Sequence, residues 1–156
     1  MAARNNPVGT DSPELVITRV FDAPRALVYK AWTEPAHIKH WSAPQGYKVT
    51  HADGDLRVGG RWRSCMRSPE GEDLWLGGVY REVIENERLV FTHAWDGPDG
   101  RPGHETLVTV QLDDEGDKTR MTFRHALFDS EKERDGHLGG WNQCFDQLGV
   151  YLAATR

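Results

Sequence analysis

Residues 130–153, SEKERDGHLGGWNQCFDQLGVYLA, are the main guide to the architecture, because no other segment is long and periodic enough to cover a whole sheet. Its apolar residues follow one another in steps of three and four, which places them on one face of a helix. They are Leu138, Trp141, Phe145, Leu148 and Leu152. At roughly 1.5 Å per residue the helix spans about 34 Å, enough to cross about five or six strands. The stretch therefore predicts a long C-terminal helix that lies on a sheet.

The start of this helix is marked by a capping box, in which Ser130 is followed three residues later by Glu133. Glu131 and Glu133 also place negative charge at the first turn, where unpaired backbone amides favour it. Three glycines interrupt the helix, although each costs roughly 1 kcal/mol relative to alanine. They are Gly136, Gly139 and Gly140. These glycines indicate either a close approach of the helix to the sheet or room left for a bound molecule.

Upstream of the helix, strand patterns alternate with turn signals. The first strand, Glu14–Phe21, alternates and is rich in β-branched residues. Two short helices follow, Pro24–Thr33 and Pro35–Trp41, and each begins with a proline, which suits a first helical turn. The remaining segments with the two-residue period of strands are Tyr47–Asp53, Gly60–Arg67, Asp73–Ile84, Arg88–Trp95, Glu105–Leu112 and Thr119–Ala126. Because the links between them are short, we expect an antiparallel meander and an α+β fold with a curved sheet of seven strands.

The two-residue period also predicts which strand residues face the long helix. The inward sets are Trp62, Ser64 and Met66; Leu89, Phe91, His93 and Trp95; Val108, Val110 and Leu112; and Met121, Phe123 and His125. In the strand Asp73–Ile84 the same period places Val79 inward and Tyr80 outward. His93 and His125 are either core histidines with satisfied hydrogen bonds or pocket groups that could act on a ligand as a base or donor.

Composition describes one soluble domain. The chain has 156 residues and a mass of 17.7 kDa, which is enough for one real core. A mean hydropathy of -0.65, with no apolar run near the roughly 20 residues of a membrane span, excludes insertion in a membrane. Residues 1–12 lack periodicity, so we expect a disordered tail before a single domain over residues 13–156.

Charge and cysteine usage narrow the partners and the compartment. The net charge is -5 and the arginines are scattered, which argues against a nucleic-acid partner. Cys65 and Cys144 form no disulfide framework, and Met1–Asp11 lacks the pattern of a secretion signal. The sequence therefore predicts a cytoplasmic protein.

No catalytic or metal-binding set can be recognised. His37 and His40 could share a metal if a third ligand came near, but an exposed helix face is the alternative. The segment 54–61 has the glycine spacing of a phosphate loop without its Lys and Ser or Thr, which indicates a bend that directs Trp62. No inward acid is placed to orient a histidine beside Ser64. We therefore predict no catalytic residue, no metal and no cofactor.

Several short motifs are spread from about Ile17 to Leu152. They are TRVFDAP at 18–24, AWT at 31–33 with Trp41, DLR at 55–57, GGRW at 59–62, GVYREV at 78–83, ERLVFT at 87–92, GHETLVTV at 103–110 and GW at 140–141. Together they make the chain similar to the bacterial proteins grouped with the activator of the heat-shock protein 90 ATPase, in the START-like (SRPBCC) superfamily. The resemblance implies a helix-grip fold with two short helices between strands 1 and 2. It also implies a cavity between sheet and helix that in the superfamily commonly holds apolar or aromatic small molecules.

Three functions remain as alternatives. The first is binding of a small hydrophobic molecule, for example one with an aromatic or polyketide-like ring system, which the six tryptophans and the helix glycines favour. The second is a cyclase or dehydratase that would use His93 or His125. The third is a chaperone-linked protein-interaction module, which predicts an exposed apolar patch. For the first function, the predicted ligand-binding residues are Trp32, Trp62, Met66, Phe91, His93, Trp95, Val108, Met121, Phe123, Gly140, Trp141 and Phe145.

Overall fold

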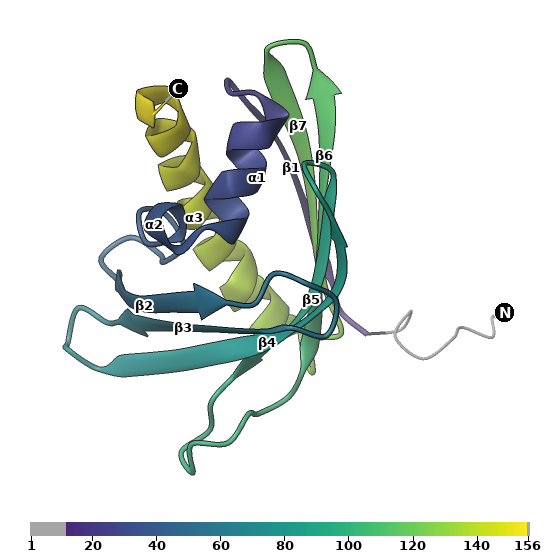
Figure 1. Ribbon diagram of the computed structural model, residues 1–156. Coiled ribbons are helices and arrows are strands. Elements are labelled where there is room, and N and C mark those ends of the chain that lie inside the picture. The colour runs from purple at the N-terminus through teal and green to yellow at the C-terminus, as the bar shows by residue number, and fades with distance from the viewer. Residues whose placement is uncertain (1–11, 156) are drawn as a thin grey trace, which may run out of the picture.

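The computed structural model describes residues 12–155, so the predicted tail over residues 1–12 lies outside the described part except for Ser12. It shows a strongly curved sheet with the helices on its concave side (Figure 1). The strands are β1 Leu15–Phe21, β2 Lys48–Gly54, β3 Arg61–Arg67, β4 Asp73–Ile84, β5 Arg88–Trp95, β6 Thr106–Glu115 and β7 Lys118–Ala126. They pair antiparallel in the order β1-β7-β6-β5-β4-β3-β2, which confirms the predicted sheet of seven strands.

The three helices are α1 Arg25–Thr33, α2 Pro35–Ile38 and α3 Glu131–Thr155. The predicted start of α3 is confirmed, because the Ser130 hydroxyl accepts a hydrogen bond from the backbone N–H of Glu133 at 3.1 Å. The Glu133 carboxylate reaches back to the backbone N–H of Asp129 at 3.4 Å, rather than to that of Ser130. The first contact satisfies an amide that the first turn of a helix leaves unpaired, and the second fixes the residue before the cap.

The C-terminal half of α3 makes a tightly packed core with the sheet. Phe145, Leu148 and Leu152 expose 1% or less of their surface. They belong to one apolar cluster with residues of β6 and β7 that are equally buried, namely Val108, Val110, Met121 and Phe123. In contrast, Leu138 and Trp141 from the N-terminal half of α3 are half-buried against the same cluster. The apolar face of α3 is therefore sealed against the sheet at one end only.

Strand β4 corrects one prediction from the two-residue period. Its pairing with β5 shifts register between Tyr80 and Glu82, as a β-bulge does. Upstream of the shift Tyr80 is 6% exposed and faces the core, and downstream of it Val83 packs against the core. The prediction that Tyr80 faces outward and Val79 inward is wrong, since Val79 pairs with exposed Arg61 on the opposite face.

Candidate functional site

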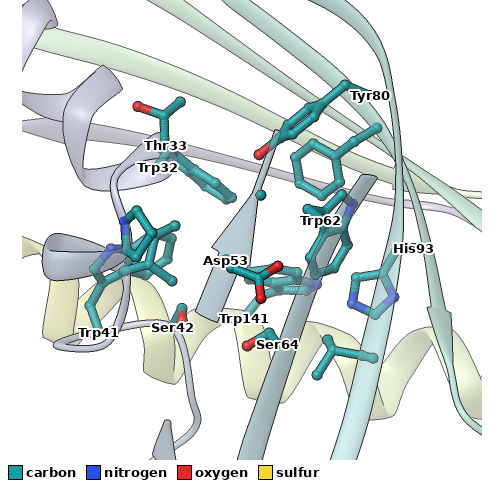
Figure 2. A pocket seen from close by; sticks show the side chains of 15 residues that line it. Trp32, Thr33, Trp41, Ser42, Asp53, Trp62, Ser64, Tyr80, His93 and Trp141 are labelled. Atoms are coloured by element: carbon teal, nitrogen blue, oxygen red, sulfur yellow. The ribbon is translucent and has the colours of Figure 1, made fainter. Parts of the chain in front are cut away.

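Two adjoining cavities lie beside the N-terminal half of α3. The first, here called the aromatic cavity, has a volume of about 80 Å³ (Figure 2). Its wall consists of the rings of Trp32, Trp41, Trp62, Tyr80, Phe91 and Trp141, with Thr33, Pro35, Ile38, Ser42, Asp53, Gly54, Ser64, Leu76 and His93. The second, the glycine cavity, has a volume of about 400 Å³. Its wall consists of Ser42, Pro44, Tyr47, Met66, Leu74, Leu76, His93, Trp95, Glu133, Gly136, His137, Gly140, Trp141 and Cys144.

The two cavities share part of their walls. Ser42, Leu76, His93 and Trp141 line both of them. His93 comes from β5 and Trp141 from α3, so the shared wall joins the sheet to the helix. A molecule bound in one cavity would therefore contact residues of the other.

Hydrogen bonds fix the tryptophans of these walls in place. The indole N–H groups donate to the carbonyl oxygens of Ala31 (from Trp41, 2.9 Å) and Thr92 (from Trp62, 3.1 Å), and to ring nitrogens of His125 (from Trp141, 3.0 Å) and His137 (from Trp95, 3.0 Å). The indole N–H of Trp32 is buried and has no partner among residues 12–155. Four indoles are thus held by hydrogen bonds within the protein, whereas Trp32 brings both its ring and an unpaired donor to the wall of the aromatic cavity.

His125 is a core histidine with all its hydrogen bonds made. Its Nδ1 accepts the indole N–H of Trp141, so its Nε2 carries the hydrogen and donates to the Thr106 hydroxyl at 2.7 Å. That hydroxyl in turn donates to the backbone carbonyl of His93 at 2.8 Å. Burial holds the pKa of His125 far below its ordinary value, and repulsion from His93 and His137 lowers it further. His125 is therefore a neutral residue with a structural role.

His93 differs from His125, because its ring makes no hydrogen bond with another residue of the described part. It is 3% exposed and lines both cavities. Burial lowers its pKa to about 3, with repulsion from His137 as a smaller cause. The ring is therefore neutral near pH 7, and it offers one donor and one acceptor nitrogen.

Tyr80 supplies a further polar group without a hydrogen-bond partner in the described part. Its hydroxyl makes no hydrogen bond within residues 12–155, although the side chain is 6% exposed. Figure 2 shows this hydroxyl directed toward the space that Trp32 and Trp62 border. Burial raises the pKa of Tyr80 to about 12, so the hydroxyl keeps its proton and can donate or accept.

The glycines of α3 border the glycine cavity instead of the sheet. A Cβ atom built on Gly136 would meet nothing within 4 Å, and one on Gly140 would meet the Pro44 side chain at 3.6 Å, an ordinary contact. Both residues line the cavity, whereas Gly139 is exposed and lines neither cavity. Of the two alternatives for these glycines, the geometry fits room beside the helix and not close approach to the sheet.

The predicted ligand-binding residues divide into two groups. Five line the aromatic cavity: Trp32, Trp62, Phe91, His93 and Trp141. Three more line the glycine cavity: Met66, Trp95 and Gly140. Val108, Met121, Phe123 and Phe145 line neither cavity, because they lie in the packed core at 0% exposure.

Several residues of the walls were not predicted. Tyr80 was missed because a bulge reverses the alternation of β4. His137 was missed although it lies four residues before Trp141, which places both on one face of α3. Ile38 and Ser42 come from α2 and the segment after it, where no period indicates direction.

The histidines considered for a metal have other contacts. His37 lies with Nδ1 2.6 Å from the Tyr151 hydroxyl, and the ring of His40 stacks on that of Tyr151 at 4.9 Å. They therefore dock α2 and the residues that follow it on the C-terminal part of α3. Within residues 12–155 no group of three or more His, Cys, Asp or Glu side chains is placed to hold a metal. In the same part of the chain, no helix has the length and apolar character needed to span a membrane.

The curved sheet around a long C-terminal helix defines a helix-grip protein of the START-like class. Within that class, the chain belongs to the family described as activator of Hsp90 ATPase homolog 1-like protein, whose model matches residues 22–153. Both the predicted family and the predicted fold are thereby confirmed.

Solved structures of bacterial proteins agree with this assignment. A protein of Nitrosomonas europaea is 27% identical, with a TM-score of 0.77, over 91% of this chain and 95% of that one. A protein of Rhodobacter sphaeroides is 25% identical, with a TM-score of 0.79, over 96% and 98%. The AHSA1 protein of Silicibacter pomeroyi, 24% identical with a TM-score of 0.85 over 92% and 100%, shows the same fold. No curated protein matches the chain.

Proposed function

We propose that this protein binds a small hydrophobic molecule, for example one with an aromatic or polyketide-like ring system, between the sheet and α3. The observation that carries the proposal is the indole N–H of Trp32, a buried donor without a partner within residues 12–155, in a wall of aromatic side chains. An unsatisfied buried polar group costs about 1 to 3 kcal/mol, so such groups are usually paired with protein, water or ligand. A bound molecule would supply the partner.

The shape and lining of the cavities support the same function. Ligand sites are mostly apolar and aromatic, with a few polar groups that orient the ligand. Here the rings of the aromatic cavity are the apolar part, and His93 and Tyr80 are the orienting groups. Within residues 12–155, neither His93 nor His125 is hydrogen-bonded to a carboxylate, so the geometry gives the cyclase or dehydratase alternative no added support.

A protein partner such as a chaperone, which the family's description suggests, is the second candidate function. It would use an exposed apolar patch. In the described part, the large apolar residues that are exposed are Val16, Val20, Leu56, Val58, Trp75, Ile84 and Val150. They are distributed over β1, the β2–β3 loop, β4 and α3. This distribution favours the cavity over the surface. We also propose a cytoplasmic location, which the two free and buried cysteines support.

The substitution Gly140→Leu tests the proposed function. A leucine at this position would extend into the glycine cavity without a steric clash, since the Cβ itself has room. We expect Nile red, an uncharged dye that fluoresces on burial, to bind the parent protein and to bind Gly140→Leu at least tenfold more weakly. The free energy of unfolding should stay within about 1 kcal/mol of the parent, because the gain in helix propensity offsets the crowding.

Gly139→Leu is the matched control, since Gly139 is the neighbouring exposed position on the same helix. It should bind Nile red as the parent does. Equal binding by all three proteins would show that the dye does not occupy this cavity. If the parent binds neither the dye nor any molecule seen in native mass spectrometry of the fresh preparation, the proposed function is wrong.

A further inference from the structure

The wall of the aromatic cavity contains a polar atom whose role in hydrogen bonding is fixed by its chemistry. An indole N–H can only donate, and that of Trp32 is buried without a partner within residues 12–155. The Trp32 side chain is 7% exposed and comes from the last turn of α1, which borders the cavity. The atom that would pair with this group must therefore be a hydrogen-bond acceptor.

Aromatic rings surround Trp32 and account for the missing partner. The centroid of its ring lies 4.8 Å from that of Trp41, 5.9 Å from that of Phe123, and 6.1 Å from those of Trp141 and Phe145. A phenylalanine ring has no acceptor atom, and an indole has only a donor. These neighbours pack against the ring of Trp32 but cannot pair with its N–H.

Tyr80 provides a second donor in the same cavity. Its hydroxyl makes no hydrogen bond within residues 12–155, and burial raises its pKa to about 12, so it keeps its proton near pH 7. Figure 2 shows this hydroxyl directed toward the space that Trp32 borders. A carbonyl oxygen has two lone pairs, so a single oxygen can accept from both an indole N–H and a hydroxyl.

The charges near the cavities favour an uncharged acceptor. Among residues 12–155, no lysine or arginine lines either cavity. Asp53 bonds to the His51 ring at 2.6 Å and pairs across the strands with Arg63, which balances its charge on the outer face of the sheet. Arg63 also forms an ion pair with Asp96 and lies over the ring of Trp75. A carboxylate in the cavity would lose its hydration without a compensating cation, which costs free energy.

From this arrangement we propose that the ligand carries an uncharged carbonyl group, as a ketone does, whose oxygen accepts the indole N–H of Trp32. The Tyr80 hydroxyl donates to the same oxygen, and the apolar part of the ligand packs on the rings of the wall. The inference rests on the proposed function and adds to it the chemical group that is recognised. A hydrocarbon would leave the indole N–H unpaired, and so would an ammonium group, which can only donate.

Two probes of nearly equal shape test for the acceptor. Acetylnaphthalene and isopropenylnaphthalene differ only in the oxygen or CH₂ group that is double-bonded to the same carbon. Their affinities for the full chain are measured by equilibrium dialysis at neutral pH. We expect the ketone to bind at least as tightly as the alkene, although only the ketone gives up hydrogen bonds to water on binding. Naphthoate should bind more weakly than the ketone by about tenfold or more.

The outcomes separate this inference from the proposed function. If the alkene binds more tightly than the ketone, or if naphthoate matches the ketone, the carbonyl proposal is wrong while the proposed function stands. Binding of none of the three probes would overturn both.

A pair of variants tests the role of Trp32. Trp32→Phe removes the donor and should weaken the ketone relative to the alkene by about fivefold, as expected for the loss of one hydrogen bond. Trp75→Phe makes the same change on the outer face of the sheet and should leave the ratio of the two affinities unchanged. An unchanged ratio in Trp32→Phe would contradict the proposal.

A spectroscopic measurement on the parent protein gives the same test without a change in packing. With isotope-labelled tryptophan each indole N–H gives one proton–nitrogen signal, and that of Trp32 is assigned from its contacts with Trp41 and Phe123. Because a hydrogen bond shifts the proton downfield, the Trp32 signal should lie further downfield with the ketone than with the alkene. Equal positions with both probes would show that Trp32 does not donate to the ligand.

Discussion

The two halves of α3 differ in how closely their common apolar face packs against the sheet. The C-terminal half carries Phe145, Leu148 and Leu152, which fill the space to the sheet at 1% exposure or less. The N-terminal half carries Gly136 and Gly140, and cavities remain beside it. Since both halves lie on the same sheet, the size of the helix residues decides where the domain is packed and where it is hollow.

The same contrast recurs between two neighbouring histidines. The rings of His93 and His125 have centroids 4.9 Å apart, and both are almost fully buried. His125 has partners on both nitrogens, whereas the His93 ring makes no hydrogen bond to another residue of the described part and faces the cavities. Burial alone therefore does not identify a binding residue. The number of unmade hydrogen bonds distinguishes the two.

The largest effect is expected at the packed end. Leu148→Ala should lower the free energy of unfolding by about 2 to 5 kcal/mol, because a fully buried leucine leaves a cavity when it is truncated. Leu138→Ala at the hollow end should cost clearly less, since Leu138 is half-buried. Urea denaturation of both variants measures the difference. Equal losses, or a loss below about 0.5 kcal/mol for Leu148→Ala, would remove the distinction between the two ends.

A smaller effect is expected from pH. His93 has a pKa of about 3 in the folded protein and an ordinary value of 6.5 when unfolded, and the pKa of His125 is lowered as well. Between pH 6.5 and about 3, the unfolded chain therefore binds more protons than the folded protein. The contribution of these histidines to the free energy of unfolding is thus fully present above pH 6.5 and is lost as the pH falls toward 3. Each histidine adds up to about 1.4 kcal/mol per pH unit to this loss.

Replacement of His93 measures how much this residue contributes to the pH dependence of the unfolding free energy. His93→Phe should reduce the dependence of the unfolding free energy on pH between about 6 and 5 by up to about 1.4 kcal/mol per unit, because one depressed pKa is removed. The substitution breaks no hydrogen bond between the His93 ring and another residue of 12–155. Urea titrations at several pH values measure the slope. An unchanged slope would mean that the folded protein accepts a proton on His93.

No effect is expected from metal ions. His93, His125 and His137 lie with ring centroids 4.9 to 6.0 Å apart, but indole and hydroxyl partners occupy the nitrogens of His125 and His137. Zinc or a chelator should therefore leave the melting temperature unchanged in a thermal scan. A reproducible shift of several degrees with either reagent would show that these three histidines, or His37 and His40, hold a metal.

Much of the fold could be predicted because its signals are local. The predicted strands Asp73–Ile84 and Arg88–Trp95 coincide with β4 and β5, since alternation and turn residues mark both ends. The long helix was also predicted, and its observed end at Thr155 is two residues beyond the predicted Ala153. Periodicity and capping are properties of neighbouring residues, which a single sequence contains.

The site could be predicted only in part, because the burial of a side chain depends on residues that are distant in the sequence. Alternation correctly placed Val108 and Phe123 on the inner face, but it could not show that α3 seals that region. The β-bulge in β4 turns the Tyr80 side chain to the inner face of the sheet, and no residue of β4 indicates this bulge in the sequence. The glycines left two alternatives open, and the position of Pro44 opposite Gly140 was needed to choose between them.

The place of β1 in the sheet affects how the chain folds during synthesis. β1 lies at the edge and pairs with β7, and the ion pair between Glu14 and Arg124 joins residues 110 positions apart. A ribosome must therefore release most of the domain before β1 meets its partner, and such long-range pairing is slow. Until then its exposed Val16 and Val20 belong to an unpaired strand, which is prone to association with other chains. Messages cut short before β7 would yield polypeptides with that strand permanently unpaired.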